Sequence, residues 1–569
     1  MELISYFKFD GHIKDETGRN NAIGHNVTFV KESSAEGNGA VCLNGRNSFI
    51  EIPHTESLAF GQEDFFIGMH VKFPEDRISF GDLISKFDDQ SRTGFNVVVN
   101  GSSGGYTGMS DSKNIHFGID SGSKVKWEDC GKPSPTNTLV STFCVYNGDL
   151  YAGIADAVNP VDACRVFRHD GGQQWVDCGR VGNDPESRTV FSMIVHAGRL
   201  YAATGVWDWT KAFARDGAIS RVYRYEGGNE WTDCGQVGLG YRIMAMASHQ
   251  NELYAATDRS EVYRYLSDGQ WVFCGGDAKP KSEDPSDIFR IDTLISDGYT
   301  LYGAGRKRIY AYMGGTKWQC IANNTYDVIQ MHKLQFYQGR LCAGTWPHGR
   351  VLIFDERLEG IKNTGDLGIP TDTYQINEVN DLAYYNGKLY AGVIPLGEIY
   401  RYDGDSNWVC MRKLAENKTY DPEKIESWNR VPAMAVHNGR LYAGVSGCHG
   451  RASLNPNKND GRIFAMQCGA CVSYEKGIGA GWHHIGVLKE NKYLKIYLDG
   501  EERSRCIVNG KDNPNLSNNK PLTIGFGNMH YLNASIKDLV VIKGDITQKF
   551  VMDLYNRKEI INLVRNDQR

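Results

Sequence analysis

The sequence has no long apolar run and no excess of one charge. None of its apolar stretches approaches the roughly 18 residues that a membrane-spanning helix needs, so a membrane span is excluded. The 63 lysine and arginine residues nearly balance the 68 aspartate and glutamate residues, leaving a net charge of -5. Because this balance gives no overall electrostatic footprint for nucleic acid, we expect no nucleic-acid partner.

The N-terminal residues also lack the pattern of a signal peptide. Residues 1–10 alternate like a strand, with no basic segment followed by an apolar core. We expect either that a signal was removed before this sequence begins, or that the protein is made in the cytosol and leaves by another route. The predicted location is extracellular or on a particle surface, with the cytoplasm as the alternative.

The sequence is instead rich in glycine and aromatic residues, and it contains an internal repeat. The chain has 64 glycines, 30 tyrosines and 11 tryptophans in 569 residues. A Leu-Tyr-Ala-Gly-like motif recurs at roughly 50-residue intervals, with an apolar strand and a turn before it and an alternating strand after it. Its copies start at Leu150, Leu200, Leu253, Leu301, Leu341, Leu389 and Leu441. Four short strands at this spacing are typical of a β-propeller blade.

A strand that begins with tryptophan closes most copies, but the seventh copy has none after it. The missing strand precedes the first copy, at Trp127. We predict that Lys124–Cys130 lies beside Gly461–Met466 and closes the last blade, which removes an open sheet edge. Residues 123–471 are therefore predicted to form a seven-bladed β-propeller.

The two remaining pieces resemble the halves of a laminin G-like, concanavalin A-type jelly roll. The segments that carry the resemblance are Leu3–Asp10, Ala40–Gly45, Phe65–Pro74, Gly481–Val487, Leu494–Gly500 and Ala534–Leu539. The predicted fold class is all-β: a seven-bladed β-propeller inserted into a laminin G-like jelly-roll sandwich. Its expected segments are 1–122 (first half of the jelly roll), 123–471 (propeller) and 472–569 (second half).

The 14 cysteines favour free thiols over disulfides or metal ligands. Only Cys468 and Cys471 have CxxC spacing, and no second pair stands near them in the sequence. Others, such as Cys178 and Cys234, recur at one blade position, and residues a blade apart are too distant for a disulfide. We expect buried thiols, which agrees with synthesis in the cytosol.

Residues that break the repeat are the candidates for a binding site. Arg242, Arg290 and Arg430 share one position before the innermost strand, where blade six has Glu378, and Trp428 lies beside Arg430. Further candidates in the loops after the second strands are Trp207, Trp209, Arg308, Trp346, Arg350 and Arg451. Guanidinium groups bind carboxylate or sulfate, and indole faces stack on sugar rings. The pattern predicts an acidic glycan at the propeller mouth; the competing interpretation is a solvated charged rim.

Two alternatives remain open. His348 and His449 lie near these arginines and could act as acid or base in a lyase or glycoside hydrolase on an acidic polysaccharide. The sugar-active propellers that this chain resembles include such enzymes, but none of their catalytic motifs matches residue by residue. The second alternative is a structural or receptor-binding protein of a phage tail or injection system, with protein assembly partners, which the free thiols and missing signal favour.

The jelly-roll resemblance also implies a structural calcium ion. In that family the ion lies near an Asp-x-x-Gly turn and the last strand. Asp15 and Asp538 match that outline, and oxygen ligands suit calcium. The competing interpretation of Asp15 is an ordinary surface turn. No other cofactor is expected.

Overall fold

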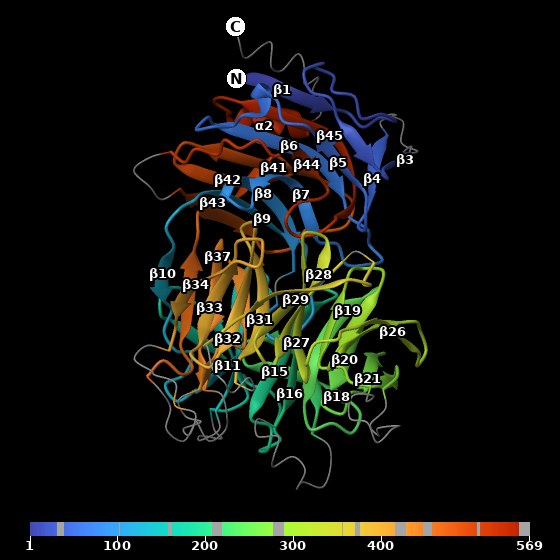
Figure 1. The fold of residues 1–569 in the computed structure, drawn as a ribbon, viewed down its shortest axis with the longest axis vertical. Helices are drawn as coiled ribbons and strands as arrows, with labels where there is room; N and C mark the ends of the chain where they lie inside the picture. The colour runs from blue at the N-terminus through green and yellow to red at the C-terminus, as the bar shows by residue number, and fades with distance from the viewer. Residues whose placement is uncertain are drawn as a thin grey trace.

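The computed structural model describes residues 1–30, 39–101, 103–156, 162–206, 219–276, 289–355, 357–369, 376–415, 421, 428–447, 458–508 and 513–556. Within these ranges regular helix is limited to the 3-10 turn Glu56–Leu58 and helix α2 (Gln548–Tyr555), so the protein is all-β. Figure 1 shows a layered sandwich that carries the N-terminus above a ring of strands.

The described part of residues 126–467 forms seven antiparallel units of four strands each, and six of them are simple meanders. Six units follow chain order: β11–β14 (Leu139–Tyr146, Asp149–Ala155, Arg165–His169, Trp175–Arg180), β15–β18 (Thr189–His196, Arg199–Gly205, Arg221–Gly227, Glu230–Gln236), β19–β22 (Ile243–His249, Glu252–Thr257, Val262–Tyr265, Trp271–Phe273), β23–β26 (Thr293–Ser296, Leu301–Ala304, Arg308–Tyr312, Trp318–Asn323), β27–β30 (Gln330–Tyr337, Arg340–Trp346, Arg350–Phe354, Ile361–Asp366) and β31–β34 (Glu378–Tyr385, Lys388–Ile394, Glu398–Tyr402, Trp408–Lys413). The seventh combines β36 (Met434–His437), β37 (Arg440–Gly444), β39 (Ile463–Gln467) and β10 (Lys126–Asp129). A separate short pair is β35 (Asn429–Arg430) with β38 (Ser446–Gly447).

The units close into a ring through their first strands. Each first strand contacts the next in the order β11, β15, β19, β23, β27, β31 and β36, and β36 contacts β11 again. The predicted seam is confirmed, because β10 pairs with β39 and places Trp127 opposite Met466. Strand β15 is buried along its whole length, whereas four of the six residues of β14, at the outside of its unit, are exposed or partly exposed. This difference explains why the first strands are apolar runs and the fourth strands alternate.

The repeated tryptophans and cysteines tie neighbouring units together. The indole Nε1 of Trp231 donates to the carbonyl of Cys178 in the preceding unit at 2.8 Å, and Trp271 donates to Cys234 in the same way. Trp175 and Trp318 repeat this geometry. The described cysteines are all free, and those at the repeated fourth-strand position are buried, as the sequence predicted.

We expect Trp231→Phe to lower the free energy of unfolding by about 1 kcal/mol beyond the loss of ring area, because the Cys178 carbonyl loses its donor. Denaturant unfolding monitored by circular dichroism measures the change. Trp271→Phe provides an internal replicate, since its geometry is the same, and should cost a similar amount. If these two hydrogen bonds contributed nothing to stability, both variants would be as stable as the wild type.

Two facing sheets form the sandwich, and each contains strands from both ends of the chain. The first has the order β3-β4-β45-β6-β41-β42-β43, with β1 also on β45; the second has the order β2-β5-β44-β7-β8-β9-β40. Strands of the first sheet are β1 (Glu2–Phe7), β3 (Thr28–Val30), β4 (Ala40–Asn44), β6 (Phe65–Lys72), β41 (Trp482–Glu490), β42 (Tyr493–Leu498), β43 (Glu501–Ile507) and β45 (Asn533–Lys543). Strands of the second are β2 (Ile23–His25), β5 (Phe49–Ile52), β7 (Gly81–Asp88), β8 (Thr93–Asn100), β9 (Asn114–Ser121), β40 (Ala470–Tyr474) and β44 (Leu522–Ile524). Phe60, Phe65 and Phe95 pack together between the sheets.

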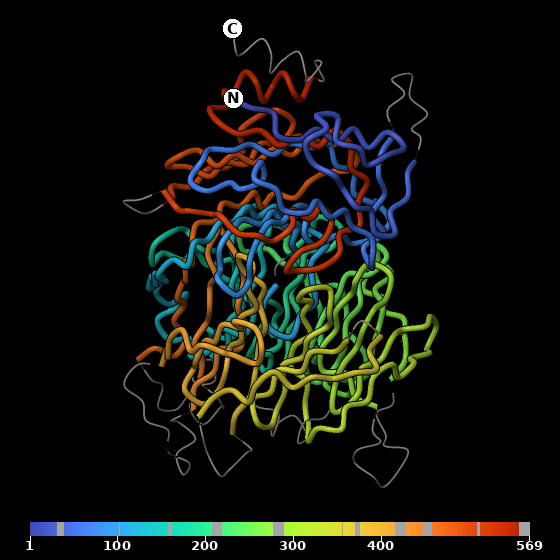
Figure 2. The backbone as a smooth tube through the Cα atoms, turned by 45° about the horizontal axis from the view of Figure 1, so that its top comes forward, coloured from blue at the N-terminus to red at the C-terminus, as the bar shows by residue number. Residues whose placement is uncertain are grey.

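The sandwich lies on the turns that join first and second strands of the ring (Figure 2). Several are two-residue Asn-Gly turns with positive φ at both residues, such as Asn386 and Gly387, which is the geometry of a tight hairpin. Asn386 donates to the carbonyls of Ile119 and Cys468 at 3.1 and 2.9 Å. Gln338 and Asn251, in two other turns, also bond to the sandwich. The turns between first and second strands thus form one surface on which the sandwich packs.

Candidate functional site at the ring mouth

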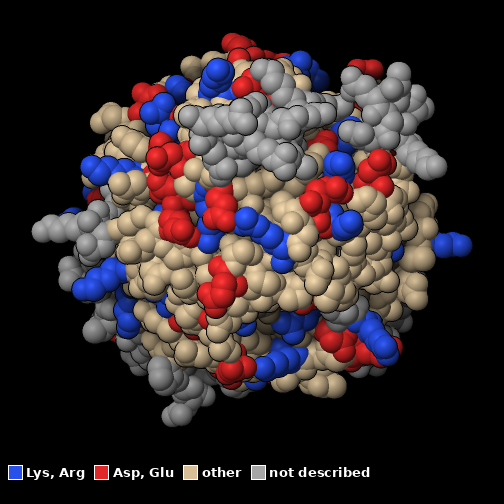
Figure 3. All heavy atoms as spheres, turned by 90° about the horizontal axis from the view of Figure 1, so that it is seen from above, with Lys and Arg blue, Asp and Glu red and all other residues tan. Residues whose placement is uncertain are grey.

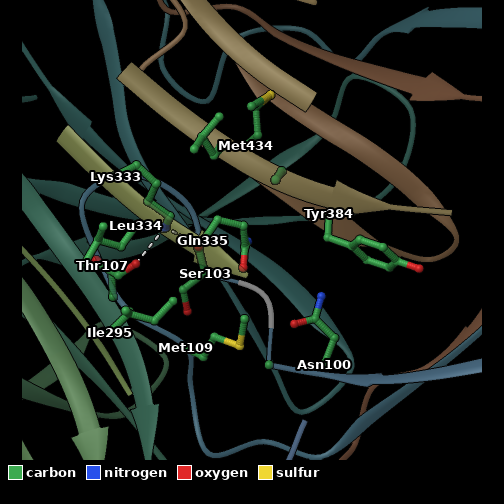
Figure 4. A pocket seen from close by; sticks show the side chains of 14 residues that line it. Asn100, Ser103, Thr107, Met109, Ile295, Lys333, Leu334, Gln335, Tyr384 and Met434 are labelled. Atoms are coloured by element: carbon green, nitrogen blue, oxygen red, sulfur yellow. Dashed lines mark hydrogen bonds between the residues drawn. The ribbon is translucent and has the colours of Figure 1, made fainter. Parts of the chain in front are cut away.

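A segment of the sandwich fills the channel of the ring. Residues 103–113, called the plug here, connect β8 to β9 and run between the first strands of the ring (Figure 4). Their backbone N–H groups donate to the ring: Gly104 to Phe143 of β11 and Gly108 to Met246 of β19, both at 2.9 Å. A Cβ on Gly104 would lie 2.6 Å from the Met434 carbonyl of β36, so only glycine fits there.

A buried ion pair anchors the plug. The ammonium group of Lys333 on β27 donates to three plug carbonyls. They belong to Ser103, Gly105 and Thr107, at N···O distances of 3.2, 2.7 and 2.6 Å. Lys333 also lies 3.6 Å from Asp381 on β31, whose carboxylate accepts from the Gly105 N–H at 3.0 Å. Burial raises the pKa of Asp381 to about 6, although Lys333 and three backbone donors oppose the rise.

Little space remains beside the plug. The cavity drawn in Figure 4 lies between Ser103, Met109, Lys333 and Tyr384 and has a volume of about 10 Å³. That is room for about one water molecule. This cavity beside the plug is therefore too small for a saccharide.

Tyr106 lies at the tip of the plug and faces the end of the ring away from the sandwich, called the mouth here. Its hydroxyl lies 2.6 Å from Nδ1 of His332, and Nε2 of His332 lies 2.8 Å from Glu378, the first residue of β31. The Tyr106 hydroxyl and Nδ1 share a hydrogen bond, and the imidazole lies at ion-pair distance from the Glu378 carboxylate, so the three groups form one polar cluster. Burial opposes ionisation of Glu378, but His332, Arg430 and a hydrogen bond from Asn380 lower its pKa to about 2. Glu378 is thus ionised under physiological conditions.

The structure brings two of the three predicted inner arginines, Arg242 and Arg430, near this tip. Burial and Glu378 raise the pKa of Tyr106, while the positive charges of Arg430 and Arg242 oppose the rise, so both guanidinium groups act on the hydroxyl. Arg242 stacks over Phe191 at 5.0 Å, and Phe191 contacts Tyr106 with 5.4 Å between ring centroids. Arg242 Nε is buried and has no hydrogen-bond partner within the described part of the chain.

Other predicted residues have structural partners or lie farther out. Arg290 is ion-paired to Asp292 at 2.8 Å, so its charge is partly neutralised. Arg350 begins a third strand and lies 3.3 Å from Asp366 on the fourth. Arg165 and Arg221 begin third strands and form the same kind of pair, which identifies a repeated brace within units. Arg308 also begins a third strand, and its charge acts on Cys320 of the outer strand β26.

The remaining candidates are Trp346, His348 and Trp428. Trp346 ends β28 and precedes a cis peptide bond to Pro347, and Trp428 is half-buried beside Asn429. His348 occupies the turn before β29, where burial and Arg350 lower its pKa. It does not join Tyr106, His332 and Glu378. Trp207, Trp209, His449 and Arg451 lie outside the described residues.

Asp15 and Asp538 do not fit a calcium site. The Asp15 carboxylate accepts hydrogen bonds from the backbone N–H groups of Tyr6, Thr17 and Asn20, at 2.9, 3.0 and 3.0 Å. Asp538 accepts from the Tyr6 hydroxyl instead. Among the described residues, no three His, Cys, Asp or Glu side chains gather where they could hold a metal ion. The turn interpretation of Asp15 is the one that its hydrogen bonds support.

Sequence reasoning missed the plug together with His332 and Lys333. The only signal for the plug was its composition, a Gly-rich stretch around Tyr106 between two apolar strands. His332 and Lys333 lie inside an apolar run and carry no motif. Their roles depend on a segment more than 200 positions earlier in the chain, and sequence periodicity contains no such information.

Comparisons with known proteins do not identify a family for this chain. No protein-family model and no curated protein matches the sequence. A crystal structure of a nidogen/laminin complex aligns with a TM-score of 0.29 and 13% identity, over 45% of this chain and 90% of that one. The Malassezia sympodialis allergen Mala s 1 gives 0.30 and 13%, over 47% and 89%. Trypanosoma rangeli sialidase with the inhibitor DANA gives 0.26 and 12%, over 75% and 94%. None of the helices in the described ranges is long and apolar enough to cross a membrane.

Proposed function

We propose that the chain is a seven-bladed β-propeller, residues 123–471, inserted into a laminin G-like sandwich of residues 1–122 and 472–569, and that it binds an acidic saccharide at the mouth. The cyclic contacts of the first strands and the closing strand β10 support the propeller. A ligand of this kind agrees with a location outside the cell or on a particle surface.

The observation that carries the binding proposal is the buried side chain of Arg242. Its Nε is a buried donor without a protein partner in the described chain, and such a donor costs roughly 1–3 kcal/mol. Arg430 brings a second positive charge to the same tyrosine hydroxyl. A carboxylate or sulfate placed there would accept from Nε of Arg242 in the combined positive field of Arg242 and Arg430. Trp428, which is half-buried and precedes Arg430 by two residues, would supply a ring for stacking on a sugar.

Binding should therefore require acid groups on the ligand and should weaken with salt, since exposed charges are screened over about 8–10 Å. We expect Arg242→Gln and Arg430→Ala each to reduce affinity by roughly 1.5–3 kcal/mol, the range for hydrogen bonds to charged groups. Arg290→Ala should have a smaller effect because Arg290 already pairs with Asp292. A glycan array with sialylated, uronic-acid and sulfated oligosaccharides and their neutral counterparts measures this.

Arg503→Gln is the matched control, because Arg503 lies on β43 of the sandwich and pairs with Glu501 at 2.9 Å. It should leave binding at the mouth unchanged. The proposal is wrong if the array shows only neutral ligands, or if binding of acidic ligands ignores both mouth substitutions. The lyase or hydrolase and phage-particle alternatives stay predictions from the sequence, since nothing in the described geometry favours either over binding.

A further inference from the structure

A second hollow lies on the outer face of the sandwich, away from the mouth. It has a volume of about 760 Å³, within the range of small-molecule sites, and is called the groove here. Its floor comes from β3, β4, β45, β6 and β41, and Tyr299 of the ring, in the turn between β23 and β24, contributes one wall. That turn is on the sandwich side of the ring, so the groove and the mouth are separate sites.

The strand register sets five groove residues in a single row across the sheet. Directly opposed pairs join Thr28 to Cys42, Cys42 to Ser535, Ser535 to Lys72 and Lys72 to Trp482. Opposed residues of antiparallel strands share a face. With neighbouring strands about 4.8 Å apart, the row is about 19 Å long. It can therefore accommodate an extended chain lying across the strands.

This row points away from the sandwich core and stays uncovered by α2. Val41, Ile536 and Val71 alternate with row residues and belong to the core between the sheets, so the row faces outward. Helix α2 covers another part of the same outer face, where its Phe550 packs with Phe66 of β6. Lys72, at the other end of β6, is exposed.

Aromatic and polar groups are held in place around the row. Trp482 lies at one end, with the Lys537 ammonium group 4.2 Å from its ring centroid. Tyr299 is fixed by two guanidinium groups, those of Arg46 at 4.5 Å and Arg77 at 4.6 Å. Asn44 and Asn533 face each other across β4 and β45 and add amides to the groove lining.

The charges at the groove favour an anionic ligand. Arg77 is neutralised by Asp76, but neither Lys72 nor Arg46 has an acidic partner among the described residues. In Figure 3, acidic and basic side chains are mixed over the described part of the sandwich end, so this face has no broad region of one charge. Lys72 and Arg46 are therefore not part of a larger basic patch. They are a local feature of the groove and its edge.

We propose that the groove binds an extended acidic oligosaccharide, with a sugar ring stacked on Trp482 and a carboxylate or sulfate on Lys72. Stacking on indole and ion pairing with an ammonium group are the interactions that such a ligand requires. The hydroxyl of Ser535 and the amide of Asn533 line the path between Trp482 and Tyr299 and would bond sugar hydroxyls. This site is independent of the mouth, so the protein would have two glycan sites on one chain.

Isothermal titration of the full chain with a galacturonic acid hexamer, a sulfated hexasaccharide and neutral maltohexaose tests the proposal. Lys72→Glu reverses an exposed charge and should preserve the fold, and it should weaken the groove site at least roughly tenfold. Trp482→Ala should do the same through lost stacking. Lys492→Glu, the same change at an exposed turn of the same sheet, should have no effect.

The two sites can be distinguished by stoichiometry. Arg242→Gln should weaken mouth binding at least roughly tenfold and leave a groove site that responds to Lys72→Glu. If Lys72→Glu and Trp482→Ala both leave affinity and stoichiometry unchanged in the Arg242→Gln background, the groove proposal is overturned whatever happens at the mouth. Equal binding of maltohexaose and the acidic hexamers at the groove would overturn the assigned ligand class.

Discussion

Replacing Lys333 with methionine is expected to lower the free energy of unfolding by about 3–5 kcal/mol, the usual cost of breaking a buried ion pair by removing one partner. Lys333 and Asp381 are 3% and 0% exposed. The variant leaves three plug carbonyls without their donor and a buried carboxylate without its counter-charge. Urea unfolding followed by tyrosine and tryptophan fluorescence measures the loss.

Lys317→Met is the control, because Lys317 is exposed on an outer hairpin and should change stability by less than about 0.5 kcal/mol. The double variant Lys333→Met/Asp381→Asn removes both charges but keeps a side-chain acceptor for the backbone donors, so it should recover part of the loss. If Lys333→Met is no less stable than the control, Lys333 does not anchor the plug.

Acid should weaken the contact between sandwich and ring, through His530. Its ring stacks on Phe336 of the ring at 4.4 Å and on Phe80 of the sandwich at 5.2 Å. Burial lowers the pKa of His530 from 6.5 to about 4, although Asp297 opposes the shift. The unfolded chain therefore takes up a proton first as the pH falls. The contribution of His530 to stability is fully present above pH 6.5 and is lost as the pH falls toward 4, by about 2 kcal/mol at pH 5.

His530→Phe should remove this loss while keeping the stack. It should also stabilise the protein at pH 7 by roughly 1–3 kcal/mol, because neither ring nitrogen of His530 has a hydrogen-bond partner in the described structure. Thermal unfolding at pH 7, 6 and 5 measures both effects. His530→Gln separates them, since it removes the titration but keeps polar atoms in the contact.

The Asp82 carboxylate accepts a hydrogen bond from the backbone N–H of His530, and burial raises the pKa of Asp82 to about 7. This group gains a proton first in the folded state, so it opposes acid loss in the wild type and in both variants. The difference between the proteins therefore isolates His530. An acid profile that is the same in all three would refute the assignment.

The sequence pattern was enough to predict the strands and the strand that closes the ring, but not the plug that fills its channel. The Trp127 strand could be found because the repeat has a fixed order, and its absence at one end was visible. The position of Arg242 followed from the same repeat. His332 and Lys333 could not be found, because each looks like a polar residue in a buried strand until the plug is in place. The hydrogen bonds of Asp15 could not be predicted for a similar reason, since only the fold shows its oxygens bonded to backbone amides.

Strand β6 has consequences for synthesis on the ribosome. Its two neighbours in the sheet, β41 and β45, are both made after the whole ring. Translation at roughly 5–20 residues per second puts on the order of 20–80 seconds between β6 and β41. Throughout that interval β6, whose residues 65–71 are buried in the finished protein, has both hydrogen-bonding edges open. The nascent chain is therefore most exposed to aggregation while its ring is being made, and chaperone dependence should be greatest then.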